Sequence, residues 1–181
     1  MNNVNLKTDR LSLRLVEQSD LEVIHNLHSI PEVDKYNTLG IPKDIEQTKA
    51  IVDVSVSDNE QLEIRRYTFM METIDHNQFV GLIALNLGSD KYKSAEVWFK
   101  LHPDHWSKGF GTEALSAILD FGFEELKLHR IEAGCAVENI GSVRLLEKAG
   151  MTREGNKRKA LPLKTGWADN YEYAILESDR A

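Results

Sequence analysis

The sequence predicts one α/β domain over residues 1–181, with a mixed, mostly antiparallel sheet and about four helices on its faces. Three observations lead to this prediction. Segments with apolar residues at a period of two are mixed along the chain with segments of helical spacing. The length of 181 residues suits a single compact core. No repeat, low-complexity tract or convincing linker divides the chain.

The first third of the chain predicts one strand and two helices. Leucines alternate with other residues at positions 11–16, which indicates a strand. Ser19 and Glu22 have the spacing of a capping box, so we expect a helix from Ser19 to about His28. Proline and glycine then mark an irregular stretch, and a second helix is predicted over residues 44–56.

The middle of the chain predicts three antiparallel strands and a helix. Residues 64–71 and 79–85 form a hairpin around a turn at residues 75–77, and a third strand covers residues 95–101. A helix follows the glycines at 109 and 111, with Leu115, Ile118 and Leu119 on its apolar stripe.

The last third predicts a strand, a helix and a closing strand. The strand covers residues 131–137, and the helix runs over residues 139–149 until Gly150 stops it. Residues 151–165 form a tail with a proline and several basic residues, and a loop is expected over residues 156–166. Residues 171–176 close the chain as a strand.

Composition and charge exclude several classes of function. The net charge of −7 leaves no broad basic face, which argues against a nucleic-acid partner. The single Cys135 lies in an apolar stretch, so a buried thiol is favoured over a nucleophile. His25 and His28 stand three apart on a predicted helix without a third ligand, so no metal is expected. No secretory leader or apolar run of membrane length is present, so we expect a cytoplasmic protein without a membrane partner.

The most informative segment is HWSKGFGT at residues 105–112, between the third central strand and the next helix. At such a junction free backbone N–H groups and the positive end of the helix dipole converge, which suits a phosphate. The segment lacks the last glycine of the dinucleotide-binding fingerprint, and it lacks the Gly-Lys-Ser/Thr of nucleotide hydrolases. A phosphate-bearing cofactor of another kind is therefore predicted.

This segment and several others together resemble the GNAT superfamily of acetyl-CoA-dependent N-acetyltransferases. The resembling branch acetylates the N-termini of ribosomal proteins (RimJ/RimL type). The matching motifs are TDRLSLR at residues 8–14, EVWFKLHP at 96–103, Asn139-x-x-Ser142, EKAGM at 147–151, and GWAD at 166–169 leading to Tyr173. One departure is Trp106, where the superfamily usually places Gln or Arg. That position is expected to contribute mainly its backbone.

The resemblance implies the GNAT fold, with the sheet splayed between its fourth and fifth strands, which end at Leu101 and Val137. Pantetheine would pair with backbone in that gap, and the pyrophosphate would lie on the amides of residues 107–112. Asn139 has a structural role as a helix N-cap, and the family pattern also gives it a cofactor contact. The implied acetyl-CoA-binding residues are Phe99, Leu101, Trp106, Ser107, Lys108, Gly109, Phe110, Gly111, Thr112, Asn139 and Ser142.

The implied reaction is direct attack of a neutral amine on the acetyl thioester in a ternary complex. A strand N–H near Leu101 would stabilise the oxyanion, an effect of roughly 3–4 kcal/mol in well-studied sites. Glu96 is our candidate base, because a carboxylate desolvated beside Trp98 could have a raised pKa. The alternative is a structural or substrate-orienting acid. Ser142 is the candidate acid for the thiolate; its alternative is an ordinary polar residue in the first helical turn.

The expected acceptor is a primary amine, foremost a protein N-terminal α-amine. The alternatives are a small amine (a polyamine, an aminoglycoside or an amino acid) and a CoA-binding sensor without turnover. Residues 36–42 and 156–166 are expected to form the acceptor wall. Glu72 and Asp169 could orient an amine, and Tyr171 and Tyr173 either border the acceptor or pack in the core. The protein could be a monomer or a homodimer.

Overall fold

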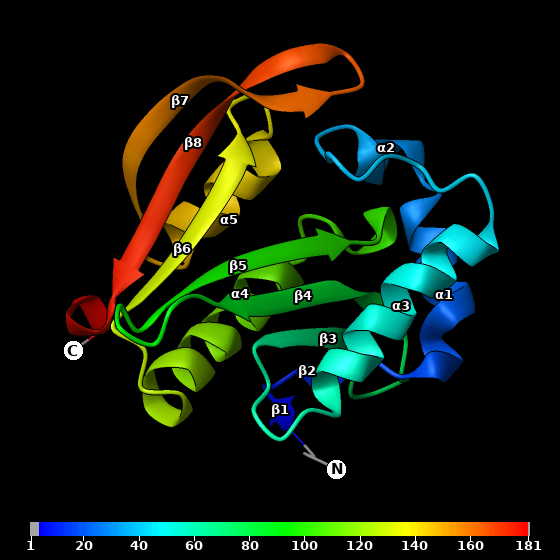
Figure 1. The fold of residues 1–181 in the computed structure, drawn as a ribbon, viewed down its shortest axis with the longest axis horizontal. Helices are drawn as coiled ribbons and strands as arrows, with labels where there is room; N and C mark the ends of the chain where they lie inside the picture. Colours follow the sequence, from blue (N-terminus) through cyan, green and yellow to red (C-terminus); the bar gives the residue numbers. More distant parts are fainter. Residues whose placement is uncertain (1–3, 181) are drawn as a thin grey trace.

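The computed structural model describes residues 4–180, and its centre is one eight-stranded sheet with the order β1-β2-β3-β4-β5-β6-β8-β7 (Figure 1). Every neighbouring pair of strands is antiparallel except β5 and β6, which run parallel. The strands are β1 (Asn5–Lys7), β2 (Leu11–Leu15), β3 (Arg66–Thr73), β4 (Phe79–Leu87), β5 (Ser94–Leu101), β6 (Arg130–Ala136), β7 (Thr152–Leu163) and β8 (Gly166–Leu176).

Five α-helices lie on the two faces of the sheet. They are α1 (Leu21–His28), α2 (Pro31–Asp34), α3 (Ile45–Asn59), α4 (Phe110–Asp120) and α5 (Ile140–Lys148). A π-helical turn, Phe121–Glu125, extends α4. No helix in residues 4–180 is long and apolar enough to cross a membrane.

Each face of the sheet has its own core. The larger core joins α4 and α5 to one face and includes Leu115, Ile118 and Leu146. The smaller core joins α1 and α3 to the other face, around Leu27 and Val52. Figure 1 shows α4 behind the sheet and α1 and α3 on its near side. The helices therefore sandwich the part of the sheet from β2 to β5.

The strand pattern of β5 decides which side chains reach which face. Val97 belongs to the larger core and Phe99 packs against it, whereas Trp98 packs against the smaller core. Successive residues of a strand point to opposite faces, so Glu96 and Lys100 lie on the same side as Trp98. We call this side of the sheet, toward α1 and α3, the acceptor face.

The predicted mixed, mostly antiparallel sheet is confirmed, but three local expectations differ from the structure. β1 was not predicted, and most of the loop expected over residues 156–166 belongs to the long strand β7. Ser19 does not cap a helix. Glu17 and Asp20 form the capping box of a short 3₁₀ turn, and α1 starts only at Leu21. The Asp20 carboxylate accepts from Glu17 N (2.9 Å), so the capping box lies two residues earlier than the predicted box of Ser19 and Glu22.

The parallel strands β5 and β6 separate after a short paired region. Their register contains only three pairs, Ser94–Arg130, Ala95–Ile131 and Glu96–Glu132. β5 continues to Leu101 and β6 to Ala136 without further pairing between them, and the two strands diverge in Figure 1. This is the predicted splay. It leaves the facing edges of the two strands free to bind an extended ligand.

Candidate active site

The loop before α4 presents an open helix N-terminus. Gly109 is the N-cap, with φ +85° in the left-handed region, and no side chain caps the helix. Ser107 also has a positive φ of +58°. The first helical hydrogen bond here runs from Glu113 N to Gly109 O (3.1 Å), so the preceding amides have no intrahelical acceptor. Amides of this kind, at the positive end of a helix dipole, suit a phosphate group.

Arg10 braces this loop from the turn between β1 and β2. Its Nη1 donates to Lys108 O (3.1 Å), its Nε donates to Glu113 Oε2 (2.7 Å), and its guanidinium carbon lies 4.6 Å from the ring centroid of Phe110. Thr8 Oγ1 donates to the other carboxylate oxygen of Glu113 at 2.5 Å. Arg10 lies in one of the motifs, but its contacts with Lys108 and Glu113 could not be predicted, because these residues lie about a hundred positions away in the sequence.

Gly111 packs closely against two neighbouring elements. A Cβ at this position would lie 2.4 Å from Leu145 Cδ1 of α5 and 3.3 Å from Leu101 Cδ2 of β5. Real Cβ atoms are essentially never that close to another heavy atom, so Gly111 permits the contact between α4, α5 and β5. Gly109 is the glycine that the backbone conformation itself requires.

The edge of β5 that faces the gap carries two free amides. His102 N donates to Val80 O of β4 (2.9 Å), so the alternate residues Phe99 and Leu101 point their backbone groups toward β6. The Trp106 indole donates to Leu101 O (2.9 Å). The Trp106 side chain therefore has a structural role, because its indole reaches back across the 3₁₀ turn at Pro103–His105.

Asn139 and Ser142 lie at the start of α5, just after β6. Asn139 is the N-cap, and its Oδ1 accepts from Ser142 N (3.2 Å), as predicted for the structural role. This bond uses the amide oxygen and leaves the Asn139 nitrogen as a donor for a ligand. The Ser142 side chain is half-buried. Both residues follow the strand that forms the far side of the gap.

Glu96 lies where the two strands begin to separate, in register with Glu132 of β6. Its side chain is exposed, so the expectation that it is desolvated beside Trp98 was wrong. Trp98 packs against the core under α1 and α3, and Glu96 lies two residues before it on the same face. Ala95 and Val97, on either side of Glu96, belong to the core on the opposite face. Glu96 thus stands as a solvated carboxylate at the rim of the gap.

A buried polar cluster that the sequence did not predict lies beside the other end of β5. It consists of the buried His28 of α1 and Asp34 of α2 together with the half-buried Lys100 of β5. His28 and Asp34 are 5% and 7% exposed. Both ring nitrogens of His28 and Oδ1 of Asp34 are buried without a hydrogen-bond partner among residues 4–180. The helical spacing places His28 on the same face as Ile24 and Leu27, but its approach to Lys100 depends on the packing of α1 against β5.

Burial shifts the pKa values in this cluster. Desolvation lowers the pKa of His28 to about 4, with smaller contributions from the charges of Lys100 and His25. Desolvation also lowers the pKa of Lys100 to about 8, although the nearby Asp34 carboxylate opposes the shift. His28 is therefore neutral at pH 7, and Lys100 has an accessible neutral form.

Two carboxylates that were considered as amine ligands are already bound. Glu72 forms an ion pair with Arg14 at 3.1 Å, and Asp169 Oδ1 accepts from Lys159 N (2.9 Å). Cys135 is buried, and desolvation raises the pKa of its thiol to about 11, which agrees with a packing role.

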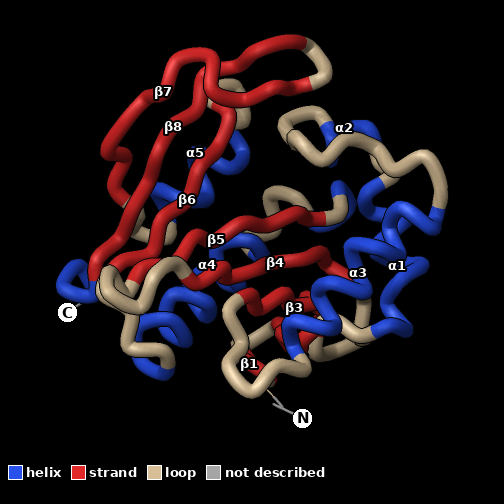
Figure 2. The backbone as a smooth tube through the Cα atoms, viewed as in Figure 1, coloured by secondary structure: helices blue, strands red, loops and turns tan. Residues whose placement is uncertain are grey.

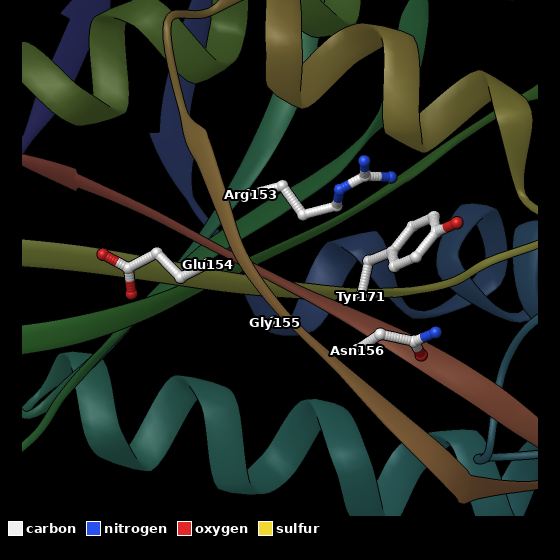
Figure 3. A pocket seen from close by; sticks show the side chains of 5 residues that line it. All are labelled: Arg153, Glu154, Gly155, Asn156 and Tyr171. Atoms are coloured by element: carbon white, nitrogen blue, oxygen red, sulfur yellow. The ribbon is translucent and has the colours of Figure 1, made fainter.

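The tyrosines of β8 belong to the core side of the sheet. Tyr173 is 1% exposed, and Tyr171 packs partly against the same core. A cavity of about 370 Å³ lies next to Tyr171 on the β7–β8 hairpin (Figure 3). The Arg153 guanidinium lies 4.5 Å from the Tyr171 ring centroid, and Figure 3 shows the two side chains on one side of β7. Tyr171 thus points away from the acceptor face.

The comparisons with known proteins identify the family of this chain. The model of the acetyltransferase (GNAT) domain matches residues 10–152. The chain belongs to the GNAT family of acetyltransferases. The N-acetyltransferase YnaD of Bacillus subtilis is 35% identical over 97% of this chain and 99% of its own length. A crystal structure of spermidine N-acetyltransferase from Vibrio cholerae, in complex with CoA and spermine, has a TM-score of 0.84 at 27% identity, covering 95% of this chain and 98% of that one.

The motifs indicated the family correctly, but the relation to the RimJ/RimL branch is distant. The ribosomal-protein-serine acetyltransferase of Escherichia coli is 24% identical over 94% of this chain and 96% of its own length. The identities to YnaD and to the Vibrio cholerae spermidine enzyme are higher. The family still establishes the general activity, so this GNAT protein is an enzyme that uses acetyl-CoA to acetylate an amine. The alternative of a sensor without turnover is set aside.

The residues of the site fit acetyl-CoA. The α4 N-terminus has uncapped amides where a phosphate can bind, and the amides of Phe99 and Leu101 face a gap with no strand in it. When bound, acetyl-CoA supplies the activated acetyl group. Among residues 4–180, no three His, Cys, Asp or Glu side chains are grouped so that they could hold a metal ion.

Proposed function

We propose that this GNAT enzyme acetylates a primary amine of a small polyamine. The observation that carries the proposal is the charge of the acceptor face. Glu96 of β5, Glu132 of β6 and Glu172 of β8 are exposed or near-exposed carboxylates on this one face of neighbouring strands. Glu132 is paired with Arg130 and Glu172 with Lys157, whereas Glu96 forms no ion pair in the described part of the chain.

This charge pattern suits a substrate with several ammonium groups. A net charge of −7 raises the local concentration of such a cation around the protein, and Glu96 provides an unpaired carboxylate at the rim of the gap. Spermidine is the acceptor that gives the Vibrio cholerae relative its name. We therefore assign Glu96 the orienting role that the sequence analysis left open, with the acceptor ammonium near its carboxylate.

For the cosubstrate, we propose that the amides of residues 107–112 bind the pyrophosphate and that Phe99 and Leu101 pair with pantetheine. The free Leu101 N–H is the donor for the thioester carbonyl oxygen, and the bond from Trp106 to Leu101 O holds that peptide in place. The Asn139 side-chain nitrogen contacts the pantetheine arm. Ser142 donates a proton to the departing sulfur.

A protein N-terminal α-amine is a second candidate acceptor. The motifs TDRLSLR and GWAD resemble the branch that modifies ribosomal proteins. The tip of the β7–β8 hairpin is exposed, including Trp167, and it would form one side of a groove for a peptide. The 24% identity to the ribosomal-protein-serine enzyme is weaker support than the similarity to the spermidine enzyme.

The experiment that separates the two candidates measures thiol release from acetyl-CoA with spermidine, a serine-initiated peptide and free serine. The account predicts the highest kcat/KM for spermidine, and mass spectrometry should find one acetyl group on the product. The Glu96→Gln variant should lose selectivity for spermidine over the peptide. A higher kcat/KM for the peptide would favour the second candidate. If no amine of the panel causes thiol release, both candidates are contradicted.

A further inference from the structure

Lys100 occupies a position beside the reacting atoms that the proposed function leaves unused. It lies between Phe99 and Leu101, the two residues whose amides face the gap. Lys100 lies two residues after Trp98 on β5, so its side chain stands on the acceptor face. An amine that reaches the thioester from this face therefore passes Lys100.

The groups around Lys100 are buried, polar and incompletely bonded. α1 brings His28 and, more distantly, His25, whose Nδ1 is bonded to Thr48 Oγ1 at 2.8 Å. α2 brings Asp34, which interacts electrostatically with Lys100 without forming an ion pair. Trp98 lies on the same strand face. Buried polar atoms in native proteins nearly always have a partner, so the unpaired atoms of His28 and Asp34 mark an incompletely bonded polar site beside Lys100.

We propose that Lys100, in its neutral form, takes the proton from the ammonium of the acceptor. The proposal rests on the proposed function and names the base for that reaction. The Lys100 nitrogen uses its lone pair to form an N–H bond, while the acceptor N–H bond breaks and leaves its electron pair on the acceptor nitrogen. That lone pair forms a bond to the acetyl carbon, and the C–S bond then breaks with its electron pair going to the CoA sulfur. Ser142 protonates the sulfur, and the second proton lost by the acceptor nitrogen passes through water to restore the Ser142 hydroxyl. The resulting Lys100 ammonium returns its proton to water before the next cycle.

The surroundings make this proton transfer feasible. Burial among α1, α2 and β5 lowers the pKa of Lys100 to about 8, so a sizeable fraction is neutral near pH 7.5. Asp34 limits the shift because its negative charge favours the ammonium form. His28 stays neutral above about pH 5, so it adds no positive charge in that range. Glu96 lacks such burial and is better suited to attract the acceptor.

The first test compares the pH profile of kcat for the wild type and Lys100→Met, with saturating acetyl-CoA and spermidine as the probe amine. The wild type should show an acidic limb with a midpoint near pH 8. In Lys100→Met the acidic limb should disappear, and kcat should fall roughly 100-fold, within the usual range for a general base. Lys91→Met, which removes an exposed lysine before β5, is the matched control and should resemble the wild type. Circular dichroism and the Kd for acetyl-CoA confirm that each variant is folded.

The second test restores a different amine at the same position. Lys100→Cys, in a Cys135→Ala background, is alkylated with bromoethylamine to give a lysine analogue with a thioether and a lower intrinsic pKa. The proposal predicts that activity returns and that the acidic limb moves to lower pH. Asp34→Asn should also move the limb to lower pH, because the charge that favours the Lys100 ammonium is lost.

Two results would overturn the role of Lys100. One is an unchanged acidic limb in Lys100→Met, and the other is a restored amine that leaves the limb at its wild-type position. Both results require that the enzyme acetylates spermidine, so they are distinct from failure of the proposed function. That failure would appear as a wild type that releases no thiol with any amine of the panel.

Discussion

Lys100 illustrates how burial gives chemistry to a side chain that looks ordinary in the sequence. In the segment EVWFKLHP it is one polar residue among apolar neighbours, and nothing in that pattern indicates its surroundings. His28 and Asp34 reach it from elements more than sixty residues earlier. Glu96 is the opposite case, because its side chain was expected to be buried and is exposed. Its position on the strand was predicted, but its exposure depends on where α1 and α3 stop covering the sheet.

At the residue scale, Glu96→Gln tests the orienting role. The substitution keeps the shape of the side chain and removes its charge. Because a single exposed charge pair contributes up to about 1 kcal/mol, KM for spermidine should rise roughly two- to fivefold. The Kd for acetyl-CoA, measured by isothermal titration calorimetry, should stay unchanged. A large loss of kcat with an unchanged KM would instead indicate that Glu96 itself transfers the proton.

A second prediction at this scale concerns Asp20, which is 4% exposed and binds Arg14 through two hydrogen bonds of 2.7 and 2.8 Å. Asp20 also accepts from Glu17 N, which caps the turn before α1. In Asp20→Ala, the half-buried Arg14 keeps one carboxylate partner, Glu72. The free energy of unfolding should fall by about 2–4 kcal/mol in urea titrations. Asp53→Ala, which removes an exposed ion pair with Lys49, is the control and should change stability little.

At the scale of elements, the glycine-bearing loop and α4 were predicted well because their signal is local. Gly109, the apolar stripe of α4 and the strand before them lie within about thirty residues. β7 was missed because most of its residues are exposed and polar, so it has no alternation with a period of two. Among residues 4–180 it pairs with β8, and that pairing leaves no pattern in the sequence of β7. Figure 2 shows how long this hairpin is relative to the other strands.

The contact from Arg10 to the loop before α4 gives a prediction at the element scale. Arg10→Met removes the hydrogen bonds to Lys108 O and Glu113 and should let the loop relax. KM for acetyl-CoA should rise about tenfold, as expected for the loss of charged hydrogen bonds that hold the loop. KM for S-acetyl-pantetheine, which lacks the pyrophosphate, should not change. Equal rises for both thioesters would show that Arg10 supports the whole fold and not the phosphate loop.

At the scale of the whole molecule, buried His28 couples folding to pH. Its pKa is about 4 in the folded state against an ordinary value of 6.5, so the unfolded chain binds a proton between these values and the folded chain does not. The contribution of His28 to the free energy of unfolding is therefore fully present above about pH 6.5 and is lost as the pH falls toward 4. At pH 5 the loss should be about 2 kcal/mol.

Urea titrations at pH 7 and pH 5 check this prediction, with His28→Leu as the comparison. The variant should lose less stability than the wild type between the two pH values. His76→Leu, which changes an exposed histidine in the β3–β4 turn, should keep the wild-type dependence. An identical pH dependence in His28→Leu and the wild type would contradict the assignment.

The whole account depends on the gap between β5 and β6 and on the open N-terminus of α4. A crystal structure with CoA tests this most directly. The account predicts the pyrophosphate on the amides of Ser107 to Thr112 and the pantetheine arm beside Phe99 and Leu101. The account would be contradicted by CoA bound elsewhere with that loop empty, or by a β5–β6 ladder that continues past Glu96 and closes the gap.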